Sequence, residues 1–187
     1  MKIRCPWVPA DNQLYIDYHD KEWGVPVHND KRHFEFLILE GAQAGLNWQI
    51  ILKRRSGYKK AFANFNPQKV AQFGKKEFNQ LVKTPAIIRN KFKINSAINN
   101  AQHFLKVQKE FGSFDKYIWS FVNHKTIKHR FKTSKDYPTF IKEAEILSQD
   151  LKKRGFQFVG PTIIYAHLQA CGLVNDHAIN CYRYNQV

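Results

Sequence analysis

The two ends of the sequence carry four residues whose types suit metal binding. Cys5 and His19 stand near the start, and His177 and Cys181 stand near the finish. Two thiolates and two imidazoles are a common ligand set for structural Zn²⁺ in tetrahedral geometry. His177 and Cys181 are four residues apart, so one face of a helix would present both to one ion. A zinc ion bound by all four would join the N-terminus to the C-terminus.

The same four residues also fit an ordinary structural interpretation. The N-terminal pair contains no CxxC motif, so the pattern differs from a standard zinc finger. Buried cysteines and partly exposed histidines are common in globular proteins, and spacing alone slightly favours this second interpretation. A third cysteine, Cys171, lies in an apolar stretch and is expected to be an inert core thiol.

A second candidate site is the stretch EGAQAGLNW, residues 40–48. Glu40 interrupts an apolar run, and a carboxylate there is either paired in the interior or lines a cavity. Small residues follow it and Trp48 ends the stretch, which predicts a pocket floored by Glu40 and walled by Trp48. A solvated glutamate near a helix end, beside a core tryptophan, is about equally compatible with the sequence.

Aromatic residues are frequent in the N-terminal segment. Tyr15 and Tyr18 stand three apart, and Tyr18 directly precedes His19, so a zinc ion on His19 would hold Tyr18 in place. Aromatic faces attract planar and cationic ligands. These rings alternatively cover the core beneath an irregular segment, which explains any one of them well and the whole set less well.

The stretch TPAIIRN, residues 84–90, predicts a tight connection between two helices. Such a turn can offer backbone N–H groups to a phosphate, with the N-terminus of the second helix behind them. Arg89 and Lys93 are four apart and are expected to share a face. The pattern alone favours a simple helical hairpin with a solvated basic face.

The composition is that of a basic globular protein. The 187 residues include 30 Lys and Arg against 15 Asp and Glu, a net charge of +15, which indicates a polyanionic partner, most simply nucleic acid. No apolar run reaches the ~18 residues of a membrane span, and the basic residues lie on no single amphipathic segment, so no membrane partner is expected. The odd cysteine count and the lack of a signal-peptide pattern indicate a reducing, cytoplasmic location.

Caps and hydrophobic periodicity predict a compact all-α protein. Residues 1–29 are expected to be irregular and residues 123–137 to form a loop. The expected helices cover 31–45, 50–62, 67–74, 75–83, 90–110, 114–122, 138–155 and 161–172. One domain over residues 1–187 is expected, and two helical lobes with a middle lobe at about 67–123 also fit.

Six separated motifs resemble one family along nearly the whole chain. They are CPWV, YHDKEWGVP, LEGAQAGLNW, WSFVNH, KKRGFQFVG and ACGLVNDH, and they resemble the 3-methyladenine DNA glycosylase I family. The resemblance implies a helix-hairpin-helix fold, a structural zinc on the four terminal ligands, and Glu40 as the residue that reads the damaged base. It places Tyr18 and Trp48 beside the base, with Tyr15 and Trp23 close by. The TPAIIRN turn falls at the DNA-binding hairpin, with Ala86 where glycine is expected, and Asn47 stands where serine is expected.

The resemblance also implies an activity. The enzyme would flip N3-methylated adenine out of double-stranded alkylated DNA and hydrolyse its glycosidic bond, as a monofunctional glycosylase that leaves an abasic site. It would act as a monomer in the bacterial cytoplasm, at the nucleoid, with no organic cofactor. Two alternatives remain open from the residues themselves: a glycosylase-lyase for other damaged bases, and a non-catalytic, zinc-stapled DNA-binding module.

Overall fold

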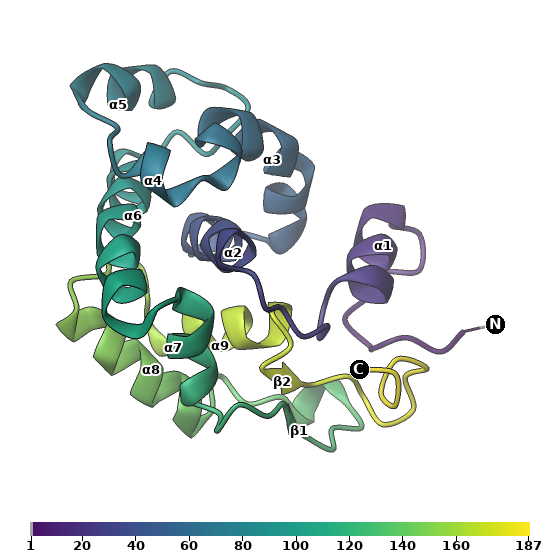
Figure 1. The fold of residues 1–187 in the computed structure, drawn as a ribbon. Helices are drawn as coiled ribbons and strands as arrows, with labels where there is room; N and C mark the ends of the chain where they lie inside the picture. Colours follow the sequence, from purple (N-terminus) through teal and green to yellow (C-terminus); the bar gives the residue numbers. More distant parts are fainter. Residues whose placement is uncertain (1) are drawn as a thin grey trace.

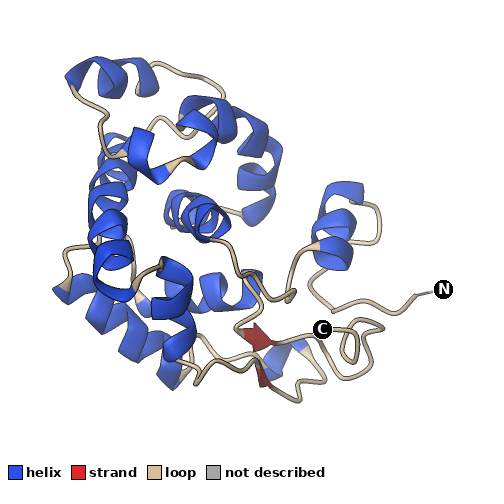
Figure 2. Ribbon diagram, in the orientation of Figure 1, coloured by secondary structure: helices blue, strands red, loops and turns tan. Residues whose placement is uncertain are grey.

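A computed structural model describes residues 2–187, and this part of the chain is mostly helical (Figures 1 and 2). Its α-helices are α1 (Gln13–Lys21), α2 (Asp30–Gln43), α3 (Trp48–Ala61), α4 (Pro67–Val70), α5 (Lys75–Leu81), α6 (Lys91–Phe111), α7 (Phe114–Ser120), α8 (Lys142–Lys153) and α9 (Pro161–Ala170). Short 3-10 turns span Ala63–Phe65 and Ser134–Asp136. Two two-residue strands, β1 (Ile127–Lys128) and β2 (Val174–Asn175), pair in parallel. The predicted helical architecture is confirmed.

Helix α2 lies at the centre of the fold, with α3 on one side of it and α7 and α9 on the other (Figure 1). Its residues are buried over most of its length because its apolar side chains point to several neighbours. The Phe34 ring lies 5.2 Å from that of Phe104 on α6, and Phe104 stacks at 4.2 Å on Phe114 of α7. Burial of each such side chain contributes about 1.5–3 kcal/mol. Helix α2 therefore holds the side chains it carries in fixed positions.

Side-chain caps set most of the helix starts that the sequence predicts. Asn29 begins α2 by accepting a hydrogen bond from the Arg32 N–H at 3.1 Å, and Ser113 begins α7 by accepting one from the Lys116 N–H at 3.0 Å. Asn66 precedes Pro67 at the first position of α4. These are the residue types that satisfy the free N–H groups of a helix N-terminus, which is why the sequence located these boundaries well.

Three predicted boundaries are wrong. Helix α4 ends at Val70 rather than at Gly74, which instead precedes α5. Residues 1–29 are not all irregular, because Asn12 caps the nine-residue helix α1 by accepting a hydrogen bond from the Tyr15 N–H at 3.3 Å. The prolines and glycine around α1 hid a short helix that fits between them. Helix α8 begins at Lys142 rather than at Pro138. Proline suits extended backbone as well as the first turn of a helix, and here the segment before α8 is extended.

Contacts of the C-terminal segment bring distant parts of the chain together. The β1–β2 pair joins the loop after α7 to the segment after α9. The Ile179 N–H donates to the Phe131 carbonyl at 2.8 Å, and the Tyr182 N–H donates to the Ile3 carbonyl at 2.9 Å. The N-terminal and C-terminal segments therefore lie side by side. No helix in the described part of the chain is both long and apolar enough to cross a membrane.

Candidate active site

A pocket of about 450 Å³ lies between α1, α2, α3 and α9, and we call it the aromatic pocket. The five residues predicted for a base pocket all line it: Glu40, Tyr18, Trp48, Tyr15 and Trp23. They come from four separate segments, so the structure brings together side chains that the sequence could only assign one stretch at a time.

Further lining residues were not predicted. Thr162, Tyr165 and Gln169 line the aromatic pocket from α9, and Tyr137 lines it from the segment before α8. The spacing of 162, 165 and 169 is that of one helix face. That signal was present in the sequence, but the apolar character of α9 made the face look like core.

Glu40 is the acidic group of the aromatic pocket. Its side chain is 4% exposed, and no hydrogen bond to its carboxylate is found among residues 2–187. Burial raises the pKa of Glu40 to about 8, because the ionised carboxylate loses its hydration in the interior. A ligand that brings positive charge or hydrogen-bond donors would satisfy this group, and the protein itself does not.

Aromatic rings surround this carboxyl group. The Tyr18 and Trp48 rings lie 5.5 Å apart at 55°, and those of Trp7 and Trp23 lie 4.8 Å apart at 74°. The Trp48 Nε1–H is buried and has no hydrogen-bond partner. Ring faces attract planar and cationic groups, and an unpaired buried donor adds a polar contact that a ligand can accept.

Asn47 connects two walls of the aromatic pocket. Its side-chain oxygen accepts hydrogen bonds from the Gln49 N–H at 2.7 Å and from the Tyr15 hydroxyl at 3.3 Å. The first contact caps α3 just before Trp48, and the second ties α1 to it. Asn47, which stands where serine was expected, therefore fixes the positions of Tyr15 and Trp48 relative to each other.

Cys5, His19, His177 and Cys181 form what we call the terminal cluster. All four side chains are buried, and one ligand atom from each lies within 4.8 Å of the others. Cys5 Sγ lies 3.4 Å from His177 Nδ1, and Cys181 Sγ lies 3.5 Å from His19 Nε2 and 3.6 Å from His177 Nδ1. Zinc bonds of about 2.0–2.3 Å at tetrahedral angles place ligand atoms at about such separations. The donor set and its geometry fit one zinc ion.

Interactions around the terminal cluster support the same fit. His19 Nδ1 lies 2.8 Å from Asp20 Oδ1, and His177 Nε2 lies 3.1 Å from the Trp23 carbonyl. Outer partners of this kind orient metal-bound imidazoles. The hydrogen bond with Cys181 and burial raise the pKa of the Cys5 thiol.

The terminal cluster lies directly behind the aromatic pocket. His19 follows Tyr18 in α1, and the Trp7 ring lies 5.4 Å from the His19 ring. The prediction that one helix carries His177 and Cys181 is wrong. His177 directly precedes a turn that Cys181 closes by donating its N–H to the Ala178 carbonyl at 2.7 Å, because β2 ends just before and leaves a short irregular segment.

The turn at residues 84–90 joins α5 to α6 and packs against α3. The Ile88 N–H donates to the Tyr58 hydroxyl at 3.1 Å. A side chain at Gly57 would lie only 2.3 Å from the Ala86 carbonyl oxygen, so glycine is required at 57 for this approach. Ala86 has no positive φ. The turn therefore forms without the glycine that was expected at that position.

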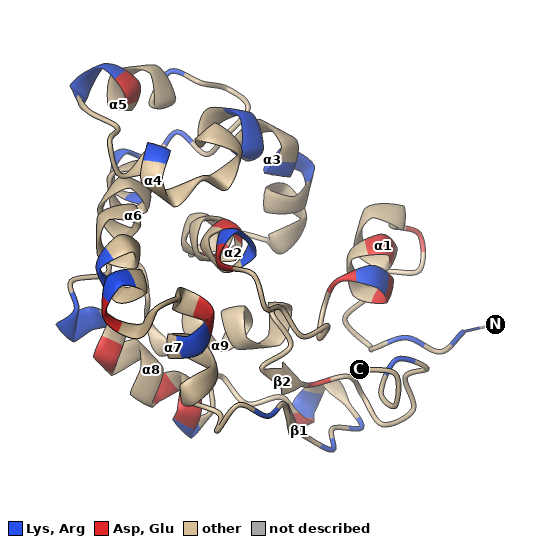
Figure 3. Cartoon of the chain, viewed as in Figure 1, with Lys and Arg blue, Asp and Glu red and all other residues tan. Residues whose placement is uncertain are grey.

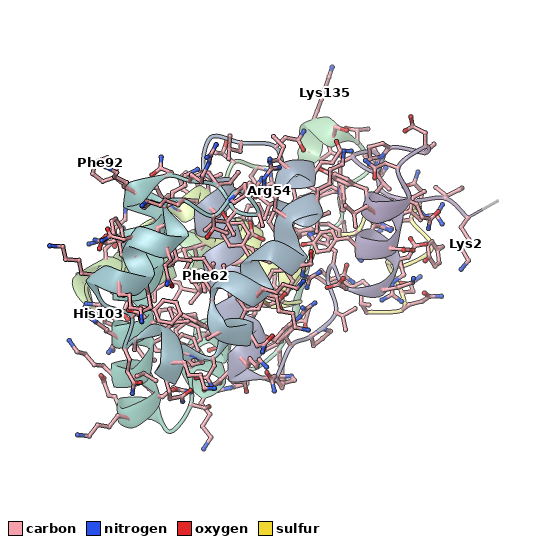
Figure 4. The ribbon with its side chains drawn as sticks, turned by 90° about the horizontal axis from the view of Figure 1, so that it is seen from above. Lys2, Arg54, Phe62, Phe92, His103 and Lys135 are labelled. Atoms are coloured by element: carbon pink, nitrogen blue, oxygen red, sulfur yellow. The ribbon has the colours of Figure 1, made fainter. Side chains whose placement is uncertain are left out.

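Arg89 and Lys93 have different surroundings. Arg89 is exposed and precedes α6, so the expectation that both lie on one helix face is wrong. The Lys93 Nζ donates to the carbonyls of Ala42 at 2.8 Å and Ala44 at 2.6 Å, at the C-terminal end of α2. A cation there is favoured by the helix dipole. Phe92 between them is 78% exposed and points away from the body of the molecule (Figure 4).

Basic side chains also follow α3. A groove between α3 and the 84–90 turn is lined by Lys53, Arg54 and Lys60, together with Ala86, and Figure 3 shows the basic positions along α3. Arg55 is different, because its guanidinium pairs with Glu22 and Glu35. The sequence predicts a helix over 50–62, but no local pattern shows that this helix borders the turn.

The chain is similar to known methyladenine glycosylases. The family described as methyladenine glycosylase matches residues 7–184. DNA-3-methyladenine glycosylase 1 of Escherichia coli is 46% identical over 178 residues, 95% of each chain. A crystal structure of 3-methyladenine DNA glycosylase I aligns with a TM-score of 0.93 at 41% identity, over 96% of this chain and 98% of that one. A tyrosine-to-phenylalanine variant of such an enzyme, solved in complex with 3-methyladenine, aligns with a TM-score of 0.90 at 37% identity, over 92% and 93%. This chain therefore belongs to the methyladenine glycosylase family.

Proposed function

We propose that this protein excises N3-methylated adenine from alkylated DNA by hydrolysis and leaves an abasic site. Its relatives include DNA-3-methyladenine glycosylases over nearly its whole length. The observation that carries the proposal is Glu40, a buried carboxyl without a protein partner, at the base of the aromatic pocket. A pocket of about 450 Å³ falls in the size range of small-ligand sites, so it can take a flipped base.

Charge gives this pocket its selectivity. Adenine methylated at N3 is a cation while it is attached to the sugar, and unmodified adenine is neutral. The rings of Tyr18 and Trp48 attract the cation, with Tyr15 and Trp23 completing the wall. The Glu40 carboxylate strengthens that attraction, and the cation in turn favours the ionised form of Glu40. Unmodified adenine in DNA is neutral and gains neither interaction.

The chemistry needs little further assistance. Water adds to the sugar carbon while the base leaves as neutral 3-methyladenine, and one proton is released. The positive charge makes the base a good leaving group, so binding and orientation supply most of the catalysis. Glu40 contributes electrostatic stabilisation to the bound base and to the positive charge that develops on the sugar. No lysine of the aromatic pocket is available to form a Schiff base, because none lines it in the described residues.

The protein binds double-stranded DNA through its helix-hairpin-helix element. Arg89 supports this assignment because it is exposed beside the N-terminus of α6, and the groove along α3 adds three basic side chains. Lys93 supports the same element from within, by fixing α6 to the end of α2. Contacts of this kind bind phosphates without reading sequence.

One structural zinc on the terminal cluster completes the proposed site. Cys5, His19, His177 and Cys181 supply four protein ligands, so the ion has no open position for catalysis. His19 and His177, if they held the ion, would fix their neighbours Tyr18 and Trp23 in place. The proposed molecule is one domain over residues 1–187, a monomer, located in the cytoplasm with the DNA it repairs.

The free bases released from alkylated duplex DNA test this function. We expect 3-methyladenine in the soluble fraction and abasic sites in the DNA, with no adduct trapped by borohydride. Borohydride trapping would instead indicate a glycosylase-lyase. Duplex binding without release of any base would indicate a non-catalytic DNA-binding module. Either outcome would overturn the proposal.

A further inference from the structure

A second cluster of metal-binding side chains lies in the core, and we call it the inner cluster. His33 comes from α2, His167 comes from α9, and Cys171 is the residue that ends α9. All three are 0% exposed. One ligand atom from each lies within 4.8 Å of the other two. None of them belongs to the terminal cluster or lines the aromatic pocket.

The distances in the inner cluster match those of the terminal cluster. His167 Nε2 lies 3.4 Å from His33 Nδ1 and 3.6 Å from Cys171 Sγ. The corresponding separations in the terminal cluster are 3.4, 3.5 and 3.6 Å. Metal bonds of about 2.0–2.3 Å place neighbouring ligand atoms this far apart. The three donor atoms therefore stand where one ion can reach all of them.

Hydrogen bonds alone satisfy these groups poorly. The His167 Nε2 atom has one lone pair or one proton, yet it faces both His33 and Cys171. A nitrogen–nitrogen separation of 3.4 Å is longer than a good hydrogen bond. A bound cation would instead accept a lone pair from each of the three facing atoms, His33 Nδ1, His167 Nε2 and Cys171 Sγ.

The surroundings of the inner cluster are those of a metal site. The Nε2 atom of His33 lies 3.2 Å from Asp115 Oδ1, an arrangement in which a carboxylate orients a metal-binding imidazole.

We propose that His33, His167 and Cys171 bind one thiophilic metal ion, Zn²⁺ or Cu⁺, at a second site apart from the terminal cluster. Imidazole and thiolate ligands select these two ions. His33 is two helical turns before Glu40 on α2, and Cys171 is two residues after Gln169, which lines the aromatic pocket. An ion at the inner cluster therefore ties α2 to α9 beneath the pocket and fixes the position of its floor.

Metal loading of the full-length protein tests the proposal. The parent and the Cys171→Ala variant are loaded with excess Zn²⁺, or with Cu⁺ under anaerobic reducing conditions. They are then desalted and analysed for metal per chain. The expected result is one ion more in the parent than in the variant. Whichever of the two loadings, Zn²⁺ or Cu⁺, shows this difference identifies the metal that the inner cluster binds. His167→Phe is expected to lose the same ion, whereas His103→Gln on α6, outside both clusters (Figure 4), is expected to keep it.

The terminal cluster is the same in the parent and in Cys171→Ala. Any metal that it binds therefore cancels in the difference between the two proteins. Cobalt substitution gives a second readout, since each thiolate bound to Co²⁺ adds charge-transfer absorption. Loss of one thiolate out of three lowers that absorption by about one third. Equal metal content in the parent and Cys171→Ala in both arms, with equal cobalt absorption, would overturn the proposal.

Discussion

Glu40 shows how one residue can serve recognition at the expense of stability. Its carboxyl group is buried at the aromatic pocket and has no hydrogen-bond partner in the described part of the chain. A buried acid that is left unpaired destabilises the fold, and neither Tyr18 nor Trp48 donates a hydrogen bond to it in residues 2–187. The arrangement is explained by a ligand that brings the missing charge and donors.

The pH dependence of stability follows from this residue. Its folded pKa is raised from 4.5 to about 8, so between these values the unfolded chain has lost a proton that the folded chain keeps. Stability therefore falls as pH rises from about 4.5 to about 8. Glu40→Gln removes this loss, and we expect the variant to exceed the parent by about 2–5 kcal/mol at pH 8 and to match it near pH 4.5.

Chemical unfolding of both proteins across this pH range measures the difference. Glu35→Gln serves as a control, because Glu35 lies on the same helix and is already paired with Arg32 and Arg55. A gap between Glu40→Gln and the parent that stays constant with pH would show that Glu40 is ionised in the folded state.

At the scale of elements, the sequence predicted helices well where caps mark them and less well elsewhere. Asn29 and Ser113 mark α2 and α7, because their side chains satisfy N–H groups that any helix leaves free. Helix α1 was missed because the prolines and glycines around it are the stronger local signal. The pocket face of α9 was also missed, since periodicity shows which residues share a face and not whether that face borders a core or a cavity.

The sequence also predicted the candidate site only in part: it identified single residues but not the contacts between them. The position of Glu40 within an apolar run is an unusual local feature, so it was identified from the sequence. The meeting of Trp48 with Tyr18 depends on how α3 packs against α1, which no local pattern encodes. Lys93 illustrates the same limit, because a lysine near a basic turn looks like a phosphate contact whether or not its ammonium binds the end of another helix.

The proposed DNA-binding turn between α5 and α6 yields a prediction for Arg89. Neutralisation in Arg89→Ala removes one exposed phosphate contact, so duplex affinity should fall and the slope of log K against log salt should decrease by about one. Fluorescence titrations of non-specific duplex at several salt concentrations measure both. Lys152→Ala, an exposed basic residue at the end of α8, should leave the slope unchanged. If the slope of log K against log salt is unchanged in Arg89→Ala, the phosphate contacts lie elsewhere on the protein.

At the scale of the whole molecule, the two chain ends support the pocket jointly. The terminal cluster takes two residues from each end, and backbone contacts such as that between Tyr182 and Ile3 hold the ends together. The pocket residues Tyr18 and Trp23 sit directly on this junction. A substitution at the C-terminus is therefore expected to alter the positions of Tyr18 and Trp23, although these residues are far from it in the sequence.

Loss of the proposed zinc should weaken the whole fold. Cys181→Ala removes one of four ligands, so the purified variant should hold one metal ion fewer than the parent. Metal sites of this kind stabilise by several kcal/mol, and at about 2–4 °C per kcal/mol for a chain of this size the unfolding temperature should fall by about 10 °C or more. Elemental analysis and calorimetry measure the two effects. Equal metal content and an unchanged unfolding temperature would show that the terminal cluster is an ordinary part of the core.

The most direct test of the central claim is a calorimetric titration of the parent and Glu40→Gln with free 3-methyladenine and with adenine. Glu40 and the methylated base can share one proton in a charge-assisted hydrogen bond worth about 1.5–3 kcal/mol, and glutamine cannot. We predict that Glu40→Gln weakens binding of 3-methyladenine by roughly 10- to 150-fold and changes adenine binding much less. Equal affinity of both proteins for 3-methyladenine would contradict the assignment of Glu40 as the residue that reads the base.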